Sequence, residues 1–389
     1  MKITDIKTFF VDPGVTVDLG DTKNWLFIRI ETDEGIRGWG ECYTLLDRER
    51  SIAAYVDHIG HYLVGRNPLN IKNFTTVMYE DYADKQGAMD YFCAISGIEQ
   101  ALWDIVGKWL NTPVYNLLGG SCRDKIKVYA NGWWDDAQTP EEYAHKATQV
   151  VRSGFKALKF YPFDGLKQNY ISKQKEQLAI DKVRAVREAI GPDIDLMIDV
   201  YRILSPLYAI RAARMLEEFK PFWYEDPIAP DSIDDLAEVR RNINIPVVTG
   251  EALYTKSDYR QVFEKRAADI INPDVCSCGG ILEMKEIAAM AEPYQVIVSP
   301  HNYNSTTIGL AASLHVSACI PNFLILEYFV NFKARSDEIS VCPFNVEDGY
   351  ISIPQGPGLG MEINEEALAR YPYRDFVNPA VRSCFDESS

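Results

Sequence analysis

The sequence predicts a closed parallel β/α barrel that is preceded by a smaller α+β domain. Seven short apolar runs between residues 156 and 327 each end in a charged or proton-transferring residue. From Asp199 onward, successive run ends are 26, 26, 23, 27 and 26 residues apart, which is about the length of one strand, one helix and two loops. The 389 residues exceed one ordinary domain and suit a barrel of about 250 residues with a further unit.

Residues 1 to about 125 have a different pattern and are expected to form an α+β capping domain. Residues 1–12 and 24–43 are typical of strands, and the turn signal Asp-Glu-Gly at 33–35 indicates an antiparallel meander. From about residue 51 to 118 the apolar residues recur at helical spacing, with a stop at Asn111-Thr112-Pro113. A sheet followed by helices favours one compact α+β unit.

The β/α repeat is expected to occupy residues 126–350. Its first strand is KIKVYANG, and the first helix has Thr139 as N-cap, Pro140 at the first helical position and Gly154 as its stop. The Gly/Pro-rich segment that follows leaves the barrel, and residues 351–389 are expected to return to the capping domain. The last residues, CFDESS, are expected to be frayed.

Composition and charge exclude several classes of protein. A 47% hydrophobic content is ample for a packed core, and the net charge of −16 argues against nucleic acid as a partner. No apolar run approaches the roughly 20 residues that a membrane span requires, and the N-terminus lacks a signal-peptide pattern. The eight cysteines are scattered, with Cys276 and Cys278 as the one close pair, so we expect free thiols in a cytoplasmic protein.

Three of the run ends predict a metal site. In a parallel barrel the carboxyl ends of the strands share one mouth, and Asp199, Glu225 and Glu251 end three consecutive strands. Carboxylates so close repel one another unless a cation neutralises them, and hard oxygen ligands favour Mg²⁺. A single acidic residue in this position is often only a helix N-cap, but three in register favour the metal.

The next run ends predict a general base and two substrate contacts. Asp274 beside His301 fixes the imidazole tautomer and raises its basicity. The other histidines fall in helical patterns and are interpreted as surface or packing residues: His58, His61, His145 and His315. Lys159 is a candidate donor to a substrate carboxylate or enolate oxygen, unless it is a surface lysine, whereas Lys156 is expected to be solvated. Glu327 ends a strongly apolar strand and is expected to hydrogen-bond the substrate or share a proton with it.

These residue types suit one reaction in particular. A carboxylate-bound metal polarises a substrate carboxylate, a His–Asp base removes the neighbouring α-proton, and the metal holds the resulting enediolate. The sequence therefore predicts an enzyme that abstracts a proton next to a carboxylate.

Longer motifs carry a resemblance to a known family. They lie along nearly the whole chain: NWLFIRIETDEGIRGWGE (24–41), AISGIEQALWDIVGKWLNTPVYNLLGG (94–120), GFKALKF, WYEDP (223–227), TGE (249–251), NPDVCSCGGI (272–281), SPHN (299–302) and PGLGMEI (357–363). On these motifs the chain resembles the enolase superfamily and, within it, the mandelate racemase subgroup.

The resemblance implies a modified (β/α)₇β barrel under an N-terminal cap, and an oligomer of identical chains, an octamer or smaller. It also implies roles for individual residues. The metal ligands match Asp199, Glu225 and Glu251, the His–Asp pair matches His301 and Asp274, and Glu327 matches an electrophilic carboxylate on the eighth strand.

Two positions depart from the subgroup's pattern. Where racemases of the subgroup carry Lys-x-Lys, this chain has Lys159-Phe160-Tyr161, and Asp199 is followed by Val200-Tyr201 rather than by x-Asn or x-His. A second basic residue opposite His301 is therefore missing, which favours one-base dehydration over racemisation. Tyr161, Tyr201 and His301 itself remain alternatives for the acid that helps the β-hydroxyl leave, and either tyrosine is equally interpreted as a hydrogen-bond donor to the substrate.

The expected function is a Mg²⁺-dependent sugar-acid dehydratase that yields a 2-keto-3-deoxy acid. The alternatives are a racemase, epimerase or cycloisomerase using the same enediolate, and a non-catalytic barrel that binds sugar acids. Residues 13–24 and 43–50 are candidate cap loops that would contact a polyhydroxylated substrate. No rule converts those loops into the stereochemistry of the sugar acid.

Overall fold

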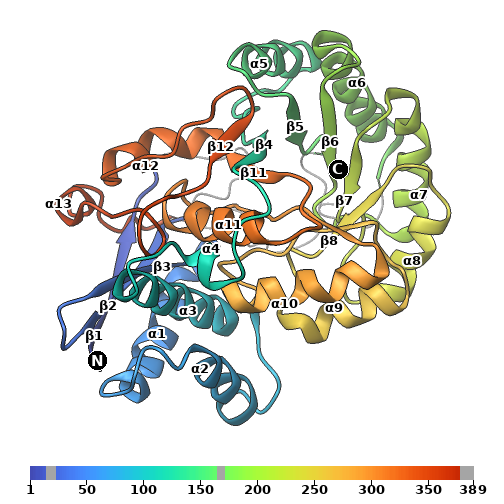
Figure 1. The fold of residues 1–389 in the computed structure, drawn as a ribbon. Helices are drawn as coiled ribbons and strands as arrows, with labels where there is room; N and C mark the ends of the chain where they lie inside the picture. The colour runs from blue at the N-terminus through green and yellow to red at the C-terminus, as the bar shows by residue number, and fades with distance from the viewer. Residues whose placement is uncertain (15–22, 164–170, 377–389) are drawn as a thin grey trace.

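The computed structural model describes residues 1–14, 23–163 and 171–376. Figure 1 shows a barrel at the right of the view and a smaller N-terminal unit, drawn in blue, at the lower left. Most of the candidate cap loop 13–24 and the C-terminal residues CFDESS lie outside the described residues.

The N-terminal unit is an antiparallel meander covered by helices, as expected. The sheet has the order β1-β2-β3, and its strands are β1 (Ile3–Val11), β2 (Trp25–Thr32) and β3 (Arg37–Cys42). The helices are α1 (Glu49–Leu63), α2 (Ile71–Val77), the π-helix η1 (Met78–Tyr82), α3 (Met89–Trp109) and α4 (Val114–Leu117). Glycines let α3 lie directly on β3, since a Cβ added to Gly40 would stand 1.8 Å from the carbonyl oxygen of Gly97.

Eight parallel strands form the barrel. Along the sheet they follow the order β10-β9-β8-β7-β6-β5-β4-β11, and they span β4 (Lys125–Asn131), β5 (Ala157–Phe160), β6 (Asp195–Asp199), β7 (Trp223–Glu225), β8 (Val247–Thr249), β9 (Ile270–Ile271), β10 (Ile297–Val298) and β11 (Leu326–Phe329). The ring closes where the amides of Leu324 and Glu327 donate to the carbonyls of Val298 and Pro300, at 2.8 and 3.2 Å. The modified barrel with a capping unit is thus confirmed.

Helices alternate with the strands and cover the outside of the barrel (Figure 1). They are α5 (Pro140–Arg152), α6 (Lys173–Ile190), α7 (Pro206–Leu216) with η2 (Glu217–Phe219), α8 (Ile233–Arg241), α9 (Thr255–Glu264), α10 (Ile281–Ala291) with η3 (Glu292–Tyr294), and α11 (Ile308–Cys319). The expected start of α5 is confirmed, because Thr139 is the N-cap, Pro140 is the first helical residue, and Thr139 and Glu142 form a capping box. Buried side chains fill the barrel interior, among them Tyr129, Met197 and Trp223, so the site lies on a packed floor.

After β11 the chain runs back to the N-terminal unit. It passes through η4 (Val330–Phe332), α12 (Lys333–Ile339), β12 (Tyr350–Ser352), which pairs antiparallel with β4, and α13 (Glu365–Leu368). The amide of Gly358 donates to the carbonyl of Thr112 at 3.0 Å, and Asn24 Nδ2 donates to the carbonyl of Arg374 at 2.9 Å. The domain boundaries near 125 and 350 remain a prediction.

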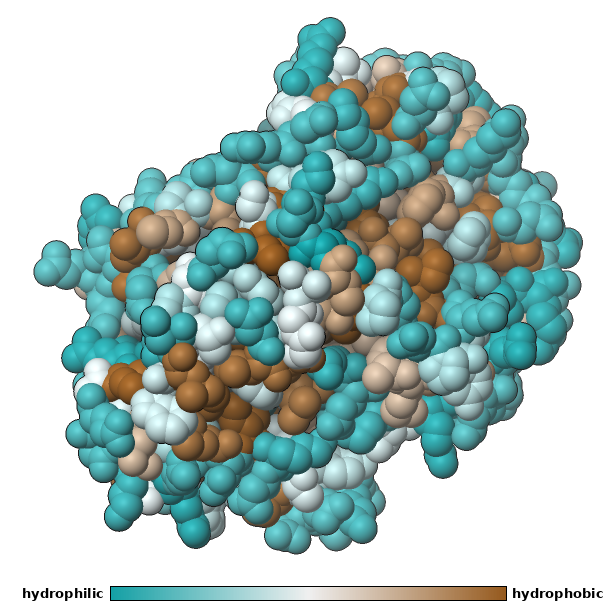
Figure 2. Space-filling view, viewed as in Figure 1, coloured by the Kyte–Doolittle hydropathy of each residue, from teal (hydrophilic) through white to brown (hydrophobic). Residues whose placement is uncertain are grey.

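The surface in this view is mostly hydrophilic, with apolar atoms gathered over the N-terminal unit (Figure 2). Within the described ranges, no helix combines the length and the apolar character that crossing a membrane requires. The seven cysteines that the structure describes are free thiols, and they include Cys276 and Cys278.

Candidate active site

The carboxyl ends of the barrel strands meet at one mouth, and the nine candidate residues gather there. The cavity at this mouth is lined by Tyr43, Asn131, Trp134, Lys159, Tyr161, Asp199, Tyr201, Glu251, His301, Tyr303 and Phe329. The three remaining candidates lie directly behind this lining and are at most 1% exposed: Glu225, Asp274 and Glu327.

Three carboxylates form a cluster with the spacing of a metal site. One oxygen each of Asp199, Glu225 and Glu251 lies within 4.8 Å of the other two. Burial raises the pKa of Asp199 to about 6 and that of Glu225 well above its usual value. The pKa of Glu251 is lowered to about 2, because Arg202 and other nearby cations outweigh its burial. Ionising all three carboxyl groups at once is therefore unfavourable without positive charge nearby, and oxygen donors of this kind suit a hard divalent cation.

Lys159 is a buried cation in the middle of this negative charge. Its Nζ lies 2.5 Å from Glu225 Oε1, 2.8 Å from Glu327 Oε1 and 3.7 Å from Asp199 Oδ2. Burial lowers the pKa of Lys159, but the carboxylates of Glu225 and Glu327 outweigh it and raise the pKa well above its usual value. The lysine therefore stays charged. It acts first as the counter-ion of two buried carboxylates while its side chain also lines the cavity.

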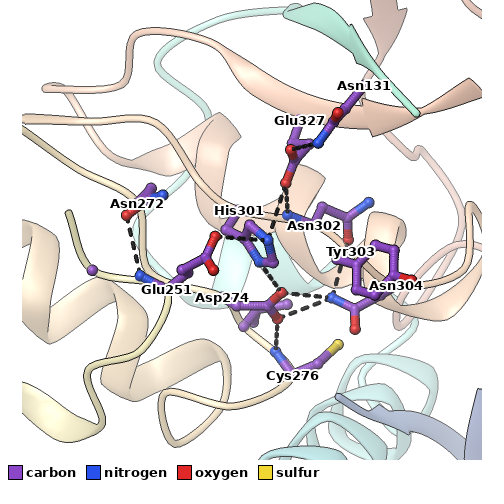
Figure 3. A network of polar contacts seen from close by, with 12 residues as sticks. Asn131, Glu251, Asn272, Asp274, Cys276, His301, Asn302, Tyr303, Asn304 and Glu327 are labelled. Atoms are coloured by element: carbon purple, nitrogen blue, oxygen red, sulfur yellow. Dashed lines mark hydrogen bonds and ion pairs between the residues drawn. The ribbon is translucent and has the colours of Figure 1, made fainter. Parts of the chain in front are cut away.

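His301 and Asp274 form the expected pair. His301 Nδ1 lies 2.7 Å from Asp274 Oδ2, which fixes Nδ1 as the protonated nitrogen. Nε2 points the other way, at 3.2 Å from Glu251 Oε2 and 3.5 Å from Glu327 Oε2 (Figure 3). Burial lowers the pKa of His301, but the carboxylates of Glu251 and Glu327 outweigh it and raise the pKa to about 9. A cation bound by the three carboxylates would oppose that rise and return His301 toward a neutral base.

Glu327 is held as an ionised acceptor. It accepts from Asn131 Nδ2 at 2.5 Å and from the amide of Asn302 at 2.8 Å (Figure 3). Its pKa is lowered, because Lys159 and His301 outweigh its burial. Such a group accepts hydrogen bonds from a substrate more readily than it donates a proton.

Aromatic rings form much of the remaining wall. Tyr161 and Tyr201 lie with their ring centroids 6.1 Å apart, at an angle of 63°. Tyr43, from the N-terminal unit, lies 5.9 Å from the His301 ring and 6.3 Å from the ring of Tyr303. The N-terminal unit therefore contributes directly to the cavity.

Sequence reasoning missed three polar residues of the site. Arg202 contacts Glu251 and lies 2.6 Å from Asp226, and it does so from a left-handed backbone with φ of 64°. Asn272 Nδ2 donates to Glu225 Oε1 at 3.0 Å, and Asn131 holds Glu327. A signal existed for Asn131, because it ends the first barrel strand, and the seven run ends named in the sequence do not include the end of that strand. Arg202 gave none, since nothing local to the sequence indicates that its backbone turns back to the mouth.

The arrangement combines three carboxylates that could hold a cation, an imidazole with a fixed tautomer and an ionised acceptor around one small cavity. Groups of this kind can hold a carboxylate-containing substrate and remove a proton from its α-carbon.

Known proteins match the chain over nearly its full length. The family model described as mandelate racemase / muconate lactonizing enzyme, N-terminal domain, matches residues 8–119, and the one described as enolase C-terminal domain-like matches 142–367. A D-galactonate dehydratase of Xanthomonas euvesicatoria is 35% identical over 390 residues, which cover 98% of each chain. A D-gluconate dehydratase of Thermoproteus tenax is 31% identical over 93% of this chain and 73% of its own.

A solved structure of a protein with a related description also matches the fold of this chain. The crystal structure of a mandelate racemase/muconate lactonizing enzyme from a Sulfitobacter species superposes with a TM-score of 0.89, at 32% identity, over 96% of both chains.

Proposed function

The chain belongs to the mandelate racemase/muconate lactonizing enzyme family of the enolase superfamily, and on that premise we propose that it dehydrates a sugar acid to a 2-keto-3-deoxy acid. The proposal draws on relatives described as D-galactonate and D-gluconate dehydratases. The observation that carries it for this chain is that His301 is the one candidate base among the described residues that line the cavity, because Lys159 is held as the charged counter-ion of Glu225 and Glu327. His301 is oriented through Nδ1, whereas tyrosine stands at position 161 where a second lysine would serve as the opposite base.

Asp199, Glu225 and Glu251 are the proposed ligands of a divalent cation, and Mg²⁺ is the proposed ion because all three donors are carboxylate oxygens. When bound, the cation supplies positive charge that stabilises the negative charge developing on the substrate's carboxylate. Lys159 cannot replace it, because that lysine already neutralises Glu225 and Glu327.

The proposed reaction combines removal of a proton from C2, loss of the C3 hydroxyl as water and conversion of the resulting enol to the ketone. His301 Nε2 removes the proton from C2, and the electron pair of the C–H bond moves into the carboxylate to give an enediolate. The electrons then return to form the C2–C3 double bond as the C3–O bond breaks, and the departing hydroxyl takes a proton and leaves as water. The resulting enol gains a proton at C3 and loses the proton of its C2 hydroxyl, which gives the 2-keto acid.

The proton donor to the leaving hydroxyl has three candidates. His301 carries the proton it has just removed, and Tyr161 and Tyr201 both line the cavity. A tyrosine with an ordinary pKa near 10 is a usable acid but a poor base at neutral pH. Epimerisation, which needs a base on each face of C2, is the weaker alternative for the same reason.

The N-terminal residues 1–125 are proposed as a capping domain over the barrel of residues 126–350. Tyr43 supports this division, because it reaches the cavity from beyond the barrel. A cytoplasmic location and an assembly of identical chains remain predictions.

A screen of sugar acids tests the proposed function. Purified protein with Mg²⁺ is incubated with each acid of a library, and 2-keto acid formation is measured against His301→Asn and against chelated wild type. We expect one stereochemical class of acid to react with wild type alone. Equal 2-keto acid formation by wild type and His301→Asn would contradict the role given to His301.

A further inference from the structure

A buried glutamate of the N-terminal unit contacts the barrel segment that follows the proposed base in the chain. Glu41, near the end of β3, is 1% exposed. Its Oε1 accepts from the amide of Ser305 at 2.8 Å, and its Oε2 accepts from Ser305 Oγ at 2.5 Å and from the amide of Gly309 at 2.8 Å. Two of these donors belong to Ser305, in the segment that joins β10 to α11, and the third is the amide of Gly309 in the first turn of α11, more than 260 residues further along the chain.

This contact replaces a missing local cap. The N-cap of α11 is Thr307, whose side chain makes no capping hydrogen bond. The first amides of a helix have no partner within the helix and favour a negative group, and the carboxylate of Glu41 supplies one. Gly309 leaves room for it, because a Cβ there would lie 3.0 Å from Glu41 Oε2.

The segment that Glu41 anchors also holds the catalytic pair. Asn304 Nδ2 donates to both oxygens of Asp274 at 2.9 Å, and the amide of Asn302 donates to Glu327 (Figure 3). Asn304 directly precedes Ser305, so the anchor on Glu41 is one residue from the group that orients Asp274. Asp274 is also connected to the residue that follows β3. The amide of Tyr43 donates to the carbonyl of Cys276 at 3.0 Å, and the amide of Cys276 donates to Asp274 Oδ1 at 2.7 Å.

We propose that Glu41 is a positioning residue for the His301–Asp274 pair, acting through Ser305 and Asn304, so that proton abstraction depends on the docking of the N-terminal unit. The inference rests on the proposed function for its kinetic consequence, but its structural part does not. A displacement of about 1 Å at a reacting group can cost about 100-fold in rate, and a loosened loop permits displacements of that size.

The same unit offers a matched control. Glu99 on α3 is also fully buried, and its carboxylate accepts from the amides of Ile281 and Leu282, at 2.7 and 3.0 Å, where α10 begins. Glu41→Gln and Glu99→Gln thus remove the same charge from the same kind of contact. Glu99 has no hydrogen bond to the segment that carries Asn304 among those that the structure describes.

Two measurements on the full-length, Mg²⁺-loaded protein test the inference. In hydrogen exchange, Glu41→Gln is expected to raise the exchange rate of the amides of residues 303–309 by at least about tenfold and to leave the rates of residues 279–283 unchanged. Glu99→Gln should raise the rates of residues 279–283 and leave those of residues 303–309 unchanged. In kinetics, Glu41→Gln is expected to lower kcat by about 10- to 100-fold, with KM changed less than about threefold and a larger isotope effect for a substrate deuterated at C2. Glu99→Gln should keep kcat within about threefold of wild type.

Ser305→Ala provides a milder variant in case Glu41→Gln does not fold. We expect it to lower kcat by about three- to tenfold, with KM changed less than about threefold and faster amide exchange in residues 303–309. Equal exchange of residues 303–309 in wild type and Glu41→Gln would overturn the inference without reference to any substrate. Unchanged kcat with a loosened loop would overturn it as well. Absence of dehydration by wild type would instead contradict the proposed function, and the exchange result would still decide whether Glu41 holds the loop.

Discussion

Replacing Lys159 by methionine should destabilise the protein strongly, because the lysine is the counter-ion of two carboxylates that have no access to water. Lys159 is 1% exposed, and Glu225 and Glu327, at 2.5 and 2.8 Å from its Nζ, are both 0% exposed. Removing one partner of a buried ion pair typically costs about 3–5 kcal/mol. We expect Lys159→Met to lose about that much free energy of unfolding in the absence of metal.

Metal should reduce this loss. A divalent cation on the three carboxylates restores positive charge beside Glu225. Glu327 gains no such charge and keeps only its hydrogen bonds from Asn131 and Asn302. We expect the loss to shrink by about 1–2 kcal/mol at saturating Mg²⁺, and by linkage the variant should bind Mg²⁺ about 5- to 30-fold more tightly than wild type.

Urea unfolding with and without a chelator measures both quantities. The control is Lys156→Met on the approach to the same strand, where the lysine is 55% exposed and pairs with an 81% exposed Asp348 at 3.4 Å. That change should cost less than about 1 kcal/mol. A loss below about 1 kcal/mol for Lys159→Met, or the same loss with and without Mg²⁺, would refute the reasoning.

Further predictions concern the metal ligands, the base, the tyrosine and a buried histidine. Glu225→Ala should abolish Mg²⁺-dependent turnover while circular dichroism shows a retained fold, and near-normal turnover under chelation would show the metal site to be misplaced. His301→Asn should lose about 100-fold or more in kcat, and Asp274→Asn less, since Asp274 only orients the imidazole; normal α-proton exchange in His301→Asn would indicate another base. Tyr161→Phe should slow turnover without changing which C2 epimer reacts, whereas reaction of both epimers would contradict its place opposite His301. Burial lowers the pKa of His315 to about 4, so its stabilising contribution is complete above the unfolded-state pKa of about 6.5 and is lost as pH falls toward 4; urea unfolding should show about 2 kcal/mol lost by pH 5, relative to His315→Asn but not to the exposed-site variant His145→Asn.

The strand ends were predictable because the barrel repeats a fixed length of chain. Asp199, Glu225 and Glu251 follow that period, and in the structure their oxygens lie within 4.8 Å of one another. Asn131 also ends a barrel strand, but its amide carries no charge and is therefore not distinguished in the sequence as a candidate. The antiparallel meander and the N-cap of α5 were also predictable from the sequence, because both depend on residues that are close together in the chain.

The missed features depend on contacts between distant segments. Arg202 contacts Glu251 from a turn in which Arg202 itself and its neighbour Tyr201 have positive φ angles, as does Asp226. The contact between Glu41 and Ser305 joins two domains across 264 residues. Neither has a local period or motif, and the balance of charge around Lys159 likewise emerges only when four strands meet.

Proton NMR of both C2 epimers of a reactive sugar acid in D₂O, with wild-type protein and Mg²⁺, tests the central claim most directly. The account predicts that one epimer alone is consumed, that water is lost, and that the 2-keto-3-deoxy product carries solvent deuterium at C3. Interconversion of the two epimers with every hydroxyl retained would contradict it and favour an epimerase.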